Sequence, residues 1–87
     1  MSAPSEKVLG RFRADMRKQL SANRHKIGWD VIDASMCYRR CLDEMGELHE
    51  AIASKATAET VRREAADVAN WLLFLVENYD PPRESKP

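Results

Sequence analysis

Apolar residues recur at helical spacing in three stretches of the chain, separated by short polar segments. In the first stretch they fall every three or four positions, which places them on one side of a helix. These positions are Val8, Leu9, Phe12, Met16 and Leu20. Ser5 is suited to cap this helix, with Glu6 in its first turn. We therefore predict a first helix from near residue 5 to residues 21–23.

The second predicted helix follows a connector, residues 24–30, in which Gly28 interrupts the backbone pattern. This helix starts between Asp30 and Ser35 and ends near Ala53. A short polar break then separates it from the next apolar stretch. Two helices joined by so short a break are expected to pack antiparallel as a hairpin.

The third predicted helix begins after Thr57, which is suited to cap it, and ends at Glu77 or Asn78. Residues 68–76 are apolar nearly all round, which is typical of a helix that is buried on most sides. Two other short helices of the same chain cannot easily cover it. We therefore expect a homodimer or homotetramer, with this helix near the interface.

No alternating strand pattern competes with the helical spacing, so the predicted fold is all-α. The expected architecture is a helical hairpin plus an N-terminal helix, assembling into a multi-chain helical bundle. At 87 residues the chain is one small domain with limited power to bury surface. We place this domain at residues 5–79, with residues 1–4 and 80–87 as flexible termini.

Composition narrows the classes of function. Charged residues make up 32% of the chain and balance to a net charge of zero, which suits amphipathic helices and argues against disorder. A neutral chain lacks the long-range positive field of a nucleic-acid binder, and the doublets Arg39-Arg40 and Arg62-Arg63 are isolated. We therefore expect no nucleic-acid partner.

Hydropathy and cysteine content favour a cytoplasmic protein. The longest apolar run, residues 68–76, is interrupted by Asn70 and is less than half of the roughly 20 residues that span a bilayer. The N-terminus lacks the apolar core of a secretory signal. Cys37 and Cys41 are too few for a disulfide framework and are best explained as core thiols. We expect no membrane partner.

Four carboxylates flank the polar break at residues 54–57. Glu44 and Glu47 precede it, and Glu64 and Asp67 follow it. The two members of each pair are three positions apart. Residues three apart on a helix lie on the same side. Closing the hairpin would place Glu47 opposite Glu64 and Glu44 opposite Asp67, which is costly unless cations lie among them. This pattern predicts a divalent metal site.

Two other interpretations of these acids remain open. They are either solvated surface residues or members of structural ion pairs with Arg40 and Arg63. Surface exposure is disfavoured because Glu44 shares the inward stripe of its helix with Cys37 and Cys41. Unpaired buried charge is expensive, so acids beside a core stripe require a partner. Spacing alone does not decide between a metal ion and the arginines.

An all-oxygen ligand set favours Mg²⁺ or Mn²⁺ over Zn²⁺. Such ions clamp phosphate chains and promote attack by water. Cationic residues that could bind phosphates, and aromatic residues that could stack on a base, occur nearby in the sequence. They are Lys26, Arg39, Arg40, Lys55, Arg62 and Arg63, with Trp29 and Trp71.

The two acidic segments resemble a known signature. Glu44-Met-Gly-Glu47-Leu-His-Glu-Ala-Ile and Glu64-Ala-Ala-Asp67-Val-Ala-Asn resemble the ExxE…ExxD motif of the MazG-like superfamily of all-α nucleoside triphosphate pyrophosphohydrolases. The resemblance covers roughly residues 8–78. It is strongest to the small single-domain branch that includes dATP/dGTP pyrophosphohydrolases.

This resemblance implies hydrolysis of a (deoxy)nucleoside triphosphate to the monophosphate and pyrophosphate, with Mg²⁺ or Mn²⁺, in nucleotide-pool control or house-cleaning. The residues that match the metal-binding and catalytic positions are Glu44, Glu47, Glu64 and Asp67. Substrate contacts are implied for Lys26, Trp29 and Asn70. The alternative is a non-catalytic helical oligomerisation or interaction module that retains the fold.

Overall fold

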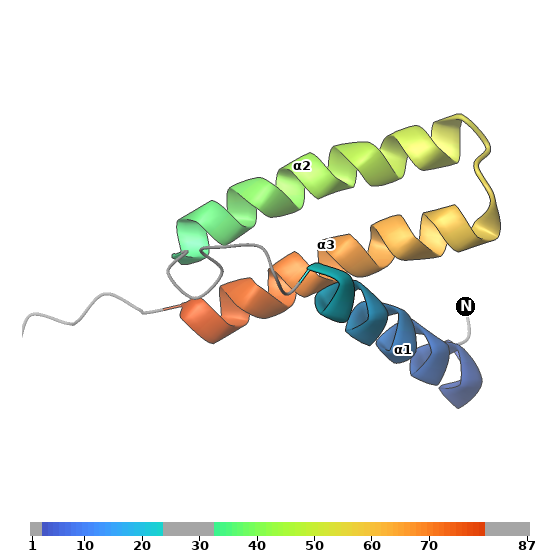
Figure 1. Ribbon diagram of the computed structural model, residues 1–87, viewed down its shortest axis with the longest axis horizontal. Helices are drawn as coiled ribbons and strands as arrows, with labels where there is room; N and C mark the ends of the chain where they lie inside the picture. Colours follow the sequence, from blue (N-terminus) through green and yellow to red (C-terminus); the bar gives the residue numbers. More distant parts are fainter. Residues whose placement is uncertain (1–2, 24–32, 80–87) are drawn as a thin grey trace, which may run out of the picture.

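The computed structural model describes residues 3–23 and 33–79, which form three helices (Figure 1). Helix α1 spans Glu6–Asn23, α2 spans Ala34–Ala53 and α3 spans Ala58–Asn78. No strand occurs in this part of the chain. The predicted all-α class is therefore confirmed, and the helices begin and end close to the predicted positions. Assembly of several chains into a bundle stays a prediction.

The ends of the hairpin helices are fixed by short polar side chains. Asp33 caps α2, its carboxylate accepting a hydrogen bond from the backbone N–H of Met36 at 2.8 Å. Thr57 caps α3 in the same way, accepting from the N–H of Thr60 at 3.2 Å. In the turn between the helices, Lys55 adopts a left-handed backbone with φ of 57°. These caps and the turn set where each helix starts, and so fix the register of the two acidic pairs.

Helix α3 is central, because both α2 and α1 pack against it and not against each other within the described residues (Figure 1). Along the α2–α3 contact the buried side chains are small. They are Cys37, Cys41 and Ala51 from α2, with Ala66 and Val68 from α3. The Cys41 thiol donates to the carbonyl oxygen of Val68 at 3.6 Å. Neither cysteine forms a disulfide, and burial raises the pKa of both thiols, as expected of core residues.

Helix α1 is attached to α3 through polar contacts. The Asn70 side-chain amide donates to the carbonyl oxygen of Met16 at 3.0 Å. Arg62 forms an ion pair with Asp15, at 3.2 Å from Nε to Oδ2. Exposed ion pairs of this kind stabilise a fold by at most about 1 kcal/mol. The position of α1 therefore depends on a few specific hydrogen bonds as well as on apolar burial.

Both hairpin helices also carry exposed apolar side chains. Several large apolar side chains of α2 and α3 keep between 45% and 72% of their surface accessible. They are Tyr38, Leu42, Met45 and Ile52 on α2, and Leu72, Leu73 and Val76 on α3. The exposure of the α3 residues agrees with the expectation that α1 and α2 of the same chain do not fully cover the apolar part of α3. None of the helices described here has the length and apolar character needed to cross a bilayer.

Candidate metal centre

Three of the four predicted acids converge at the α2–α3 contact. Glu44 and Glu47 lie one turn apart on α2, and Glu64 faces them from α3. One carboxylate oxygen from each residue lies within 4.8 Å of the others. Glu44 and Glu64 are half-buried, whereas Glu47 is exposed. The hairpin register inferred from the sequence thus brings these carboxylates to one place.

Asp67, the fourth predicted acid, is close to this group but is hydrogen-bonded to a residue of α1. Its Oδ1 accepts a hydrogen bond from Nε2 of Gln19 on α1, at 3.0 Å. Its charge still contributes to the raised pKa of both Glu44 and Glu64. Asp67 therefore borders the cluster and connects it to α1. Gln19 is not among the residues predicted from the sequence, where its only signal is a position beside the apolar stripe residues Met16 and Leu20.

Burial and the charges of neighbouring acids both disfavour the ionised form of Glu44 and Glu64. Burial raises the pKa of Glu44 to about 7, and the hydrogen bond with Glu47 and the charges of the neighbouring acids add to the effect. Burial also raises the pKa of Glu64, as do the charges of Glu47 and Asp67, while Arg63 lowers it. Near neutral pH Glu44 is thus protonated in a fraction of the molecules, and this proton offsets part of the negative charge of the cluster. A divalent cation would supply that missing positive charge.

The arginine interpretation is not supported by the described residues. Within residues 3–23 and 33–79 there is one ion pair, and it joins Arg62 to Asp15, neither of which belongs to the cluster. Neither Arg40 nor Arg63 bridges the acids there. Glu44 and Glu64 are therefore partly buried carboxylates without an ion pair among the described residues, and the charge of Arg63 offsets the raised pKa of Glu64 only in part.

Of the three residues predicted to contact the substrate, the structure describes one. Lys26 and Trp29 lie outside the described residues. Asn70 is 5% exposed, and its amide group is engaged by Met16. Its Oδ1 has no hydrogen-bond partner among the described residues. Asn70 therefore has a structural role between α1 and α3, and its contact with a substrate stays a prediction.

The geometry suits a hard cation with an incomplete protein ligand set. Three carboxylates from two rigid helices can supply part of an octahedral shell of oxygens, and the exposed Glu47 leaves one side open. Mg²⁺ sites of this kind keep positions for water and substrate phosphates.

Comparisons with protein-family models, with curated proteins and with solved structures found no match.

The raised pKa values predict how the metal-free chain responds to pH. Glu44 titrates near 7 in the folded chain instead of near 4.5, so the folded state binds protons more readily than the unfolded state. Its stabilising contribution is complete below pH 4.5 and is lost as the pH rises through about 7. Thermal unfolding in EDTA should therefore show a higher Tm near pH 5 than at pH 8.

Glu44→Gln tests the cause of this dependence. The amide cannot ionise, so the Tm should vary less between pH 5 and pH 8 than in the parent. At pH 8 the variant should be at least as stable as the parent. Glu50→Gln, an exposed change on the same helix, should retain the parent profile. A parent Tm that rises from pH 5 to pH 8 would contradict the raised pKa of Glu44.

Proposed function

We propose that this chain is a metal-dependent hydrolase that converts a (deoxy)nucleoside triphosphate to the monophosphate and pyrophosphate, using Mg²⁺ or Mn²⁺. The observation that carries the proposal is the convergence of Glu44, Glu47 and Glu64 with no ion pair to a lysine or arginine among the described residues. Unpaired acids of this kind destabilise a fold, so a functional site is the better explanation. The resemblance to MazG-like enzymes supports the same activity.

In this proposal the chain's own residues mainly place charge. Glu44, Glu47 and Glu64 would hold the cation, and Gln19 fixes Asp67 beside them. The cation, when bound, would polarise phosphate oxygens and favour departure of the leaving group. Water attacks the α-phosphorus, the bond to the bridging oxygen breaks, and pyrophosphate leaves. One carboxylate of the cluster accepts the proton of the water.

We further propose that the working unit is a homodimer or homotetramer. The exposed apolar side chains of α2 and α3 support this, because large apolar surface left accessible on a single chain often marks an interaction site. A second copy would bury Leu72, Leu73 and Val76, which one chain leaves accessible. The molar mass in solution, measured by light scattering after gel filtration, should then be two or four times that of the chain.

The same exposed apolar residues favour a second candidate, a non-catalytic helical interaction module. Both candidates predict oligomers, so the molar mass does not separate them. Metal affinity does. An interaction module has no need of the acidic cluster and should bind neither Mg²⁺ nor Mn²⁺ with appreciable affinity.

A nucleotide panel tests the proposed activity. Purified chain is incubated with the eight common ribo- and deoxyribonucleoside triphosphates in Mg²⁺, in Mn²⁺ and in EDTA, and pyrophosphate is measured. We expect stoichiometric monophosphate and pyrophosphate from at least one nucleotide, and none in EDTA. Release of orthophosphate instead, or no metal-dependent product from any nucleotide, would contradict the proposal.

A further inference from the structure

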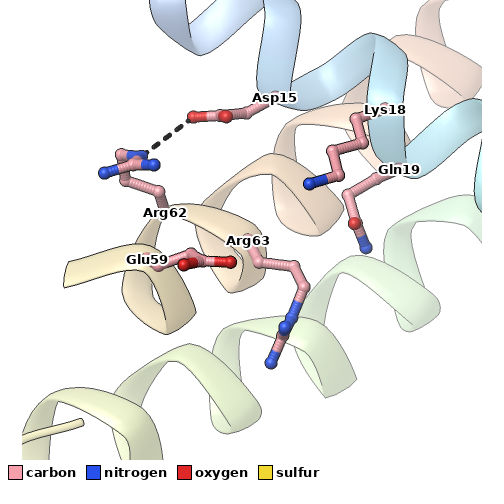
Figure 2. A pocket seen from close by; sticks show the side chains of 6 residues that line it. All are labelled: Asp15, Lys18, Gln19, Glu59, Arg62 and Arg63. Carbon is pink, nitrogen blue, oxygen red and sulfur yellow. Dashed lines mark hydrogen bonds and ion pairs between the residues drawn. The ribbon is translucent and has the colours of Figure 1, made fainter. Parts of the chain in front are cut away.

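A groove lies between α1 and the N-terminal half of α3 (Figure 2). Its volume is about 430 Å³. Charged and polar side chains line it, three from each helix. They are Asp15, Lys18 and Gln19 from α1, and Glu59, Arg62 and Arg63 from α3. A groove with such a lining is suited to a charged ligand and not to an apolar one.

The cations of this groove differ in their partners. Arg62 is occupied by its ion pair with Asp15 (Figure 2). Lys18 and Arg63 form no ion pair or side-chain hydrogen bond with any residue in ranges 3–23 and 33–79. Glu59 is then the one acid of the lining left to oppose both of them. Two cationic groups from different helices are thus available to an anion.

The groove adjoins the acidic cluster. Gln19, which lines the groove, is hydrogen-bonded to Asp67 at 3.0 Å. Arg63, which also lines it, precedes the cluster residue Glu64 in the chain and is close enough to lower the pKa of that carboxyl. A ligand that begins at the cation site can therefore extend into the groove on the α1 side.

An oligophosphate has the chemistry that fits both parts. Its oxygens can share a divalent cation with the carboxylates at one end and accept hydrogen bonds from ammonium and guanidinium groups at the other. Lysine binds phosphate as a point charge and arginine through its planar fork of donors. We propose that Lys18 and Arg63 form a phosphate-binding subsite that holds the part of the triphosphate tail released as pyrophosphate. This inference rests on the proposed function for the identity of its ligand.

Calorimetric titration with pyrophosphate and with tripolyphosphate, in the presence of Mg²⁺, tests the subsite. Lys18→Gln and Arg63→Gln should each weaken binding by at least about tenfold, the lower end of the loss expected for one charge-assisted hydrogen bond. Arg13→Gln and Arg17→Gln remove the same charge from exposed positions outside the groove and should change the affinity less than twofold. Circular dichroism should show all four variants folded, because the substituted side chains are exposed.

The outcomes separate the subsite from the activity. If the parent binds oligophosphate with the expected loss in the two groove variants but hydrolyses no nucleotide, the subsite stands and the proposed function fails. If the parent hydrolyses a nucleotide while both groove variants keep its KM and its inhibition by pyrophosphate, the subsite is wrong. Equal weakening by Arg17→Gln and Lys18→Gln would also overturn it, because the effect would then be one of overall charge.

Discussion

Glu47→Gln is expected to abolish metal-dependent pyrophosphate release while leaving the three helices folded. Glu47 is the exposed member of the converging carboxylates, so its replacement opens no cavity. The amide keeps the shape of the side chain and removes the charge that a cation requires. Loss of a group that only supports a metal ligand costs about 10- to 100-fold in affinity or activity, so loss of a ligand should cost more than about 100-fold.

The matched control is Glu50→Gln, which removes the same charge one turn further along α2, outside the cluster. It should retain activity within a factor of two. Both variants should have the Tm of the parent in EDTA or a slightly higher one. Equal activity of the parent and Glu47→Gln, at saturating Mg²⁺ and substrate, would remove the cluster from the mechanism.

Mn²⁺ is expected to stabilise the folded chain strongly at pH 8 and weakly at pH 5. A ligand present at ten times its Kd adds about 1.4 kcal/mol to the free energy of unfolding. For a domain of this size that corresponds to an increase in Tm of about 6–11 °C. At pH 5 protons compete for the same carboxylates, since the pKa of Glu44 is about 7 and that of Glu64 is also raised. The metal-dependent increase should therefore shrink as the pH falls.

Differential scanning calorimetry of the parent and of Glu47→Gln, with Mn²⁺ and with EDTA at both pH values, measures this effect. The variant should lose most of the Mn²⁺-dependent increase at pH 8. An increase of the same size at pH 5 and pH 8, or one that Glu47→Gln retains, would place the ion elsewhere on the chain.

The helices and the converging acids could be predicted because both depend on local rules. Apolar spacing and the cap at Thr57 set the ends of the helices, and the short turn forces α2 and α3 to pack antiparallel. Glu47 and Glu64 are equidistant from that turn in the sequence, so closing the hairpin places them opposite each other. No knowledge of α1 is needed for this step.

The contacts of α1 could not be predicted, because its apolar stripe does not say which flank of the hairpin it covers. The hydrogen bond from Gln19 to Asp67 joins residues 48 positions apart and depends on that choice. The sequence also does not show which of the adjacent residues Arg62 and Arg63 pairs with α1. In the structure Arg62 pairs with Asp15, whereas Arg63 lines the groove without an ion pair among the described residues.

The most direct test of the metal site is the anomalous scattering of Mn²⁺ in crystals of the chain grown with a non-hydrolysable nucleoside triphosphate analogue. We predict a peak within coordination distance of carboxylate oxygens from Glu44, Glu47 and Glu64, with phosphate oxygens completing the shell. A peak elsewhere, or none at these carboxylates while the nucleotide is bound, would contradict the account.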